Sequence, residues 1–258
     1  MKDKKREKYL CIPDAHIPDH DIKTTSLLLD FIPFYQPDHI YIMGDFMNFT
    51  KVSKYDQDPY YNTDLADEIE EGRGVLRDIV SRARKANPDV EMAYLQGNHE
   101  ARLEKFLGRN AHQLAKLTSD DEYVVSVPHL MELKKLGIKW IPEQRTLEQH
   151  NTIFIHGITV RSKGGFSAQA NLDKFGSSVV SVHTHRLALV TRTQMGVTKF
   201  SIEGGCICSL KPTPSYVVHP DWTQGFSTLT YDHETRQFYP QITPIVNHSF
   251  MYEGKLFS

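Results

Sequence analysis

The chain has 258 residues, of which 40% are hydrophobic and 24% are charged, and its formal net charge is −2. This composition is typical of a globular protein and excludes collagen-like, coiled-coil and largely disordered chains. The small net charge argues against a surface that binds polyanions throughout, and the length predicts a single α/β domain over residues 1–258.

The basic start of the chain, MKDKKREK, is not followed by an apolar stretch of signal-peptide length. No stretch reaches the roughly 18 apolar residues that a membrane span needs. We therefore expect a cytoplasmic protein without a membrane partner. Cys11, Cys206 and Cys208 lie in apolar surroundings without C-x-x-C spacing, which predicts reduced, buried thiols and argues against a zinc site built on them.

Short apolar runs alternate with helical patterns along the first hundred residues, which predicts a βαβαβ order. The expected strands are residues 8–12, 39–43, 90–95, 152–156, 178–183, 199–204 and 225–232. The expected helices are residues 24–32 and 63–86. In the second helix, apolar side chains recur on one face, Thr63 is the expected N-cap, and Asn87–Pro88 ends the helix.

Five of the apolar runs end in residues that can bind metal ions. These residues are Asp14 and His16, Asp45, Asn98 and His99, His156, and the pair His183 and His185. Each of them alone is compatible with a turn, a helix cap or a surface position. Together they collect at strand ends, and the carboxyl ends of strands in an α/β sheet form the edge where ligands bind. We therefore expect them to meet at one place.

Two aspartates, one asparagine and four of the histidines (His16, His156, His183 and His185) supply mixed oxygen and nitrogen ligands, which suit divalent transition metals better than calcium or magnesium. Seven ligands are too many for one tetrahedral ion, whereas two ions that share a bridging carboxylate would use them all. Two such ions can bind both phosphoryl oxygens and hold a hydroxide for in-line attack. The residue types therefore predict a phosphoester hydrolase.

The motifs D-x-H, G-D-x-x-N, G-N-H-E, H-G and H-x-H occur in this order and resemble those of the calcineurin-like metallophosphoesterase family. The resemblance covers roughly residues 9–205, and residues 206–258 are expected to complete the domain with further β structure. It implies a four-layer αββα sandwich, in which two mixed β-sheets pack face to face and helices flank them.

The resemblance also implies the role of each ligand. The first ion would be held by Asp14, His16 and His185, the second by Asn98, His156 and His183, and Asp45 would bridge the two. We expect manganese, with iron, zinc or nickel as alternatives, because ligand types alone do not fix the metal.

His99 would be the family's catalytic histidine, which orients the phosphate or protonates the leaving oxygen while a metal-bridging hydroxide attacks phosphorus. Asn48 and Glu100 would support the ligands from behind. In the motif GNHE, glycine is expected to permit the turn, Asn98 to offer its amide oxygen and His99 to face the substrate.

Two positions depart from the family pattern. The family usually has glycine before the last histidine pair, and here Val182 precedes His183, so the chain must turn toward the metals without that glycine. The arginine that protein phosphatases carry soon after G-D-x-x-N is absent, because Phe49, Thr50 and Lys51 follow Asn48. The second departure weakens a serine/threonine phosphatase assignment.

Substrate contacts are less clearly marked. Tyr55, Tyr60 and Tyr61 lie near two lysines in residues 51–64 and could either stack a base or pack the loop onto the core. Arg102 could touch phosphate or pair with a carboxylate.

Three functions are therefore open: a phosphodiesterase, nuclease or nucleotide phosphatase; a phosphomonoesterase that acts on proteins or small molecules; and a catalytically silent metal-binding scaffold. The net charge favours a nucleotide or single-stranded nucleic acid over long duplex DNA as the substrate. A homodimer is the default expectation for assembly.

Overall fold

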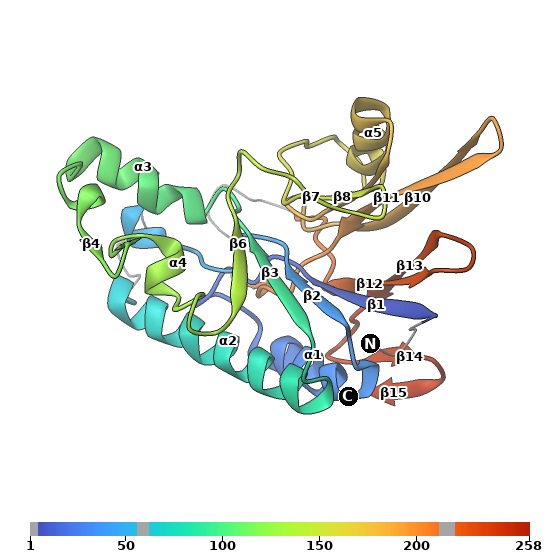
Figure 1. The fold of residues 1–258 in the computed structure, drawn as a ribbon, viewed down its shortest axis with the longest axis horizontal. Helices are drawn as coiled ribbons and strands as arrows, with labels where there is room; N and C mark the ends of the chain where they lie inside the picture. The colour runs from blue at the N-terminus through green and yellow to red at the C-terminus, as the bar shows by residue number, and fades with distance from the viewer. Residues whose placement is uncertain (1–4, 56–61, 212–219) are drawn as a thin grey trace.

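The computed structural model describes residues 5–55, 62–211 and 220–258 (Figure 1). It contains two mixed β-sheets with helices on their outer faces. In Figure 1, helices α1 (Ile22–Tyr35) and α2 (Leu65–Ala86) lie below the first sheet, and α5 (Phe166–Phe175) lies beyond the second. The predicted sandwich of two mixed sheets with flanking helices is confirmed.

The first sheet has six strands in the order β13-β12-β1-β2-β3-β6. The parallel strands are β1 (Arg6–Ile12), β2 (His39–Ile42), β3 (Glu91–Leu95) and β6 (Ile138–Ile141). The antiparallel strands are β12 (Gly225–Asp232) and β13 (Gln237–Pro244), which extend the sheet beside β1. The last part of the chain therefore pairs with its first strand.

The second sheet has five strands in the order β10-β11-β9-β8-β7. These strands are β7 (Leu147–Gln149), β8 (Thr152–Phe154), β9 (Ser178–Ser181), β10 (Leu187–Gln194) and β11 (Val197–Gly204). Strands β8, β9 and β11 are parallel, and β7 and β10 pair antiparallel at the two edges. Helix α5 contacts β9, β10 and β11.

The smaller elements surround this frame. They are α3 (Glu100–Asn110), α4 (Val127–Leu130), 3-10 helices at Thr50–Val52 and Leu114–Lys116, and the short strands β4 (Thr118–Ser119), β5 (Glu122–Tyr123), β14 (Phe250–Tyr252) and β15 (Lys255–Phe257). In the part of the chain that the structure describes, every helix is too short or too polar to span a bilayer.

The core has two parts, one on each face of the first sheet. Along β1, Leu10 and Ile12 pack with the α1 and α2 side, whereas Tyr9 and Cys11 pack between the two sheets. Successive side chains of a strand point to opposite faces, so a run of buried apolar residues fits a strand covered on both sides. This arrangement explains why the run YLCI shows no polar alternation.

Helix α2 begins one residue later than predicted. Its N-cap is Asp64 rather than Thr63, and the Asp64 carboxylate accepts a hydrogen bond from the backbone N–H of Asp67 at 2.9 Å. Both residue types can cap a helix, but a carboxylate also interacts favourably with the positive end of the helix dipole. The predicted end is confirmed, because Asn87 is the C-cap and donates its backbone N–H to Ala83.

Candidate metal centre

The predicted ligands converge at the carboxyl ends of five strands. Each lies shortly after its strand: Asp14 and His16 after β1, Asp45 after β2, Asn98 after β3, His156 after β8, and His183 and His185 after β9. Because β1, β2 and β3 run parallel and β8 and β9 run parallel, these ends share one edge of each sheet. The side chains form several buried groups in which the potential ligand atoms lie within 4.8 Å of one another.

The first group consists of Asp14, His16 and His185. His185 Nε2 lies 2.9 Å from Asp14 Oδ2 and 3.0 Å from His16 Nε2. Asp14 is fully buried, yet neither carboxylate oxygen accepts a hydrogen bond of regular geometry from the described residues. A buried carboxylate is stable only when a proton, a donor or a cation compensates its charge. This donor set therefore fits a divalent cation.

The second group consists of Asp45, His156 and His183, with Asn98 beside it. His156 Nε2 lies 3.3 Å from Asp45 Oδ2, 3.1 Å from Asn98 Oδ1 and 3.1 Å from His183 Nδ1. The other ring nitrogen of His156 is 3.2 Å from the carbonyl oxygen of Met43, to which it can donate. Such a bond fixes the tautomer that leaves Nε2 free to bind a metal.

Asp45 belongs to both halves of the site. It joins the second group and also a group with His16 and His99. Asp45 therefore shares a ligand group with residues of both predicted metal sites, His16 of the first and His156 and His183 of the second. Together, the buried histidine and aspartate clusters could hold metal ions.

Charges of both signs are concentrated here. Burial lowers the pKa of His156, but the carboxylates of Asp45 and Asp14 raise it more, to about 9. Burial likewise opposes protonation of His185, yet the Asp14 carboxylate, whose Oδ2 lies 2.9 Å from His185 Nε2, raises the pKa to about 10. Protons on these two rings would balance the carboxylates wherever no cation does. A bound cation would replace those protons.

Several candidate ligands lie in strained backbone conformations. The angle φ is 54° at His16, 46° at Asp45, 33° at His183 and 57° at His185. Residues other than glycine rarely adopt positive φ, and such strain is concentrated at functional sites. At His183 the backbone N–H of Thr184 bonds to the carbonyl of Val182, so a tight turn forms without the glycine that the family usually has.

The GNHE segment is held by a carboxylate. Glu100 Oε2 accepts hydrogen bonds from the backbone N–H groups of Asp45 and Gly97, each at 2.9 Å. Its Oε1 accepts from the N–H of Met47 at 3.1 Å and from the hydroxyl of Tyr94 at 2.7 Å. Glu100 thus joins the ends of β2 and β3 behind the ligands.

The role predicted for Gly97 was wrong. Its φ is not in the positive region that requires glycine. A Cβ there would instead overlap Asp45 N and Oδ1 and would lie 2.8 Å from Glu100 Oε2. Glycine is needed because the loops after β2 and β3 approach closely, whereas the turn itself would accept another residue.

His99 lies immediately before α3 and faces the ligand cluster. Its backbone N–H donates to Asp45 Oδ1 at 2.8 Å. Its Nδ1 is 2.9 Å from Asn48 Oδ1, and its Nε2 is 2.7 Å from Arg102 Nη2, which donates. Burial lowers the pKa of His99 to about 4, so the ring is neutral near pH 7 in the ion-free protein.

Arg102 and Asn48 fix this ring together. Arg102 Nη1 donates to the carbonyl oxygen of Asn48 at 2.9 Å, and Asn48 also bonds to Asp19. Of the predicted substrate tyrosines, Tyr55 is 66% exposed, and Tyr60 and Tyr61 lie outside the described residues. The hypothesis that Tyr55 packs its loop onto the core was therefore wrong.

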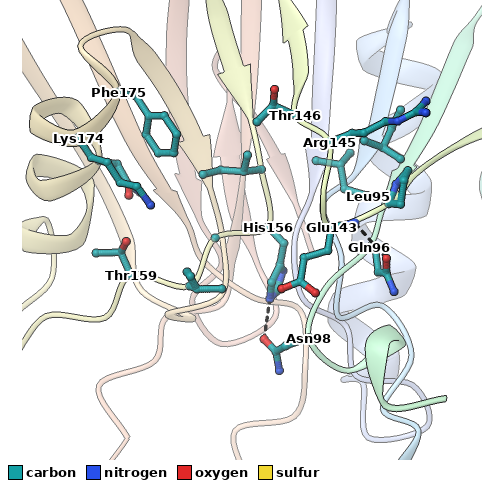
Figure 2. A pocket seen from close by; sticks show the side chains of 16 residues that line it. Leu95, Gln96, Asn98, Glu143, Arg145, Thr146, His156, Thr159, Lys174 and Phe175 are labelled. Atoms are coloured by element: carbon teal, nitrogen blue, oxygen red, sulfur yellow. Dashed lines mark hydrogen bonds between the residues drawn. The ribbon is translucent and has the colours of Figure 1, made fainter. Parts of the chain in front are cut away.

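Two features were missed from the sequence. Cys206 and Cys208 are free and buried, as expected, but their sulfur atoms lie within 4.8 Å of each other and of a nitrogen of His185. A pocket also opens beside Asn98 and His156, and its lining includes Glu143, Arg145, Lys174 and Phe175 (Figure 2). The Cys-x-Cys spacing places the two cysteines near each other along the chain but does not indicate their approach to His185, and no motif marks the pocket.

No protein-family model matches the sequence. The gene 54 protein of Mycobacterium phage D29 is 25% identical over 258 residues, which cover 96% of this chain and 97% of that protein. A single-mutant Vps29 from Entamoeba histolytica matches with a TM-score of 0.47 and 15% identity, over 95% of this chain and 96% of that chain.

Nuclease MPE from Pseudomonas putida matches with a TM-score of 0.36 and 14% identity, over 90% of this chain and 87% of that chain. These TM-scores describe a distant likeness. The architecture observed in this chain, two mixed sheets with flanking helices, agrees with the sandwich that the motif resemblance implied.

Proposed function

We propose that this protein is a phosphoesterase that uses two divalent metal ions, with manganese as the expected metal. The observation that carries the proposal is a pair of ligand groups, one with Asp14 and one with Asp45, which are linked because Asp45 also clusters with His16 of the first group. One group offers Asp14, His16 and His185, and the other offers His156, His183 and the amide oxygen of Asn98. Two ions bound there would act as Lewis acids on phosphoryl oxygens and lower the pKa of water.

The protein's own residues would position the ester. His99 lies beside the ligand cluster, with its ring held between Asn48 and Arg102, so it would orient the phosphate. It would give a proton to the leaving oxygen only after taking one up itself, because burial keeps the ring neutral near pH 7. Arg102 would supply positive charge beside that phosphate. Glu100 would keep Asp45 and Asn98 in register by holding the two loops that carry them.

The proposed overall reaction is hydrolysis. Water adds to phosphorus, the bond between phosphorus and the ester oxygen breaks, and the leaving oxygen takes up a proton. We favour a phosphodiester or nucleotide substrate over a protein phosphomonoester, because the arginine that protein phosphatases carry soon after the G-D-x-x-N motif is absent after Asn48.

The test combines metal content with turnover of bis-p-nitrophenyl phosphate and p-nitrophenyl phosphate in manganese. We expect two metal equivalents in the wild type, a loss of metal and turnover in Asp45→Asn, and retained metal in His99→Ala with turnover about 10²- to 10⁴-fold lower. His112→Ala, at an exposed position, is the matched control and should behave as the wild type.

The outcomes separate the candidate functions. Metal binding without turnover of either ester, in wild type and His99→Ala alike, would contradict the proposal and favour a metal-binding scaffold. Turnover of the monoester alone would exclude the diesterase assignment.

A further inference from the structure

The pocket beside the proposed metal ligands has a volume of about 210 Å³ (Figure 2). Asn98 and His156 lie at one end of it, and their side chains are joined by a 3.1 Å hydrogen bond. Lys174 and Phe175, at the end of α5, stand on one side, and Arg145 stands on the opposite side. Pockets for drug-sized ligands typically measure about 300–1,000 Å³, so this one suits a single monomer unit.

The two cations at this pocket are available to a ligand. Arg145 and Lys174 are both exposed, and neither forms an ion pair with any residue that the structure describes. Asp173 precedes Lys174 but pairs with Arg192 on β10 instead. An anion that enters the pocket would meet the Lys174 ammonium on one wall, and the exposed Arg145 side chain, which extends away from His156 in Figure 2, would have to turn inward to reach it.

The wall between the cations and the ligand cluster is apolar. It includes Leu95, Ile141 and Ile155 as well as the half-buried ring of Phe175. The Lys174 ammonium lies 5.1 Å from the centroid of that ring. A planar base could stack on such an aromatic face, which contributes about 1–3 kcal/mol per base in proteins that bind single strands.

Glu143 adds a negative group near His156 in the pocket (Figure 2). Its backbone N–H donates to Gln96 Oε1 at 3.0 Å, which fixes this part of the wall. Its carboxylate would accept a hydrogen bond from a sugar hydroxyl or a base N–H, and it would repel a phosphate that is not held by the metal ions. From the proposed metal ligands outward, the pocket thus offers a site for the scissile phosphate, then a middle part lined by Glu143 and apolar side chains, and then a second site for an anion.

We propose that this pocket binds the nucleoside next to the scissile phosphate, and that Arg145 and Lys174 bind the following phosphate of the same strand. The inference rests on the proposed phosphoesterase function and names its substrate class, a dinucleotide or the end of a single-stranded nucleic acid. A simple phosphomonoester has no group that fills this pocket.

Calorimetric binding of two probes to the manganese-loaded protein tests the second phosphate site. The probes are thymidine 3′,5′-bisphosphate and thymidine 5′-monophosphate. We expect the wild type to bind the bisphosphate about tenfold more tightly, because charge-assisted hydrogen bonds to phosphate are strong. In the double variant Arg145→Ala/Lys174→Ala, this preference should fall below about twofold.

The matched control is Lys139→Ala, which removes an exposed cation of neighbouring β6 that does not line the pocket. It should keep the tenfold preference, and a preference lost there as well would overturn the inference. Equal affinity for the two probes in the wild type would also overturn it.

Phe175→Ala should weaken the binding of both thymidine probes but leave the affinity for inorganic pyrophosphate unchanged. Unaltered thymidine binding in this variant would remove the nucleoside from the proposal.

Turnover of bis-p-nitrophenyl phosphate, measured in parallel, separates this inference from the proposed function. Turnover without a preference for the second phosphate would leave the phosphoesterase function standing and overturn the pocket assignment. Binding that depends on Arg145 and Lys174 without any turnover would keep the pocket and contradict the phosphoesterase function.

Discussion

The two sides of the site differ in how firmly they are held. On one side, the loops after β2 and β3 are buried and joined by Glu100, which accepts four hydrogen bonds from Asp45, Met47, Gly97 and Tyr94. On the other side, the cations of the pocket are exposed and have no ion partner among the described residues. The proposed chemistry thus sits on a rigid unit, and the proposed recognition uses side chains that can adapt.

The largest expected effect comes from breaking the rigid side at Gly97. In Gly97→Ala, the new methyl group would overlap Asp45 and press against Glu100, so the two loops must separate. We expect a loss of about 3 kcal/mol in the free energy of unfolding together with weaker metal binding. Chemical denaturation and metal titration would measure both.

Gly74→Ala on α2 is the matched control, because an added Cβ there would meet no atom within 4 Å. It should raise the free energy of unfolding by about 0.5–1 kcal/mol, since alanine favours a helix more than glycine does. If Gly97→Ala were as stable as this control and bound metal normally, the rigid unit described above would not exist.

The same contrast explains what the sequence could predict. Asp14, Asp45 and the histidines stand directly after apolar runs, so their type and position in the chain indicated strand ends and metal ligands. The requirement for glycine at position 97 depends instead on how closely Asp45, in the loop after another strand, approaches it. The sequence around Gly97 does not reveal this distance between two loops.

The pocket and the cysteine pair were hidden for a related reason. Arg145 and Lys174 are separated along the chain and belong to no motif, and only the packing of α5 against the second sheet brings them to one pocket. Cys206 reaches His185 because it forms a β-bridge with Asp14. Tertiary contacts of this kind cannot be read from spacing or composition.

A second, smaller effect on stability is expected from Glu68, which holds the backbone next to Asn48. Glu68 on α2 is fully buried and accepts the backbone N–H of Phe49. Burial raises the pKa of Glu68 from 4.5 to about 7, although the hydrogen bond from Phe49 opposes the shift. The folded protein therefore holds this proton more tightly than the unfolded chain between these two pH values.

The stabilisation from this proton is complete below about pH 4.5 and is lost as the pH rises to about 7. We expect Glu68→Gln to remove a decline of about 2–3 kcal/mol in the free energy of unfolding over that interval. Urea denaturation at several pH values would measure it, with Glu104→Gln as the exposed control. An unchanged pH dependence in Glu68→Gln would assign the decline to other groups.

The smallest effect on the free energy of unfolding is expected at Tyr55, in the exposed part of the chain that follows the loop after β2. The Tyr55 side chain is 66% exposed, and the contact described for its ring is the Lys54 ammonium at 5.2 Å from the centroid. Tyr55→Ala should therefore change the free energy of unfolding by less than about 0.5 kcal/mol, as should Tyr123→Ala at another exposed tyrosine.

If Tyr55 also stacks a base, Tyr55→Ala alone should weaken the binding of short oligothymidylate, because an aromatic face in a cationic setting attracts bases of any sequence. Equal oligothymidylate affinity in the two variants would restrict recognition to the pocket between Arg145 and Lys174, whereas a loss of stability in Tyr55→Ala alone would show that this tyrosine supports the loop after all.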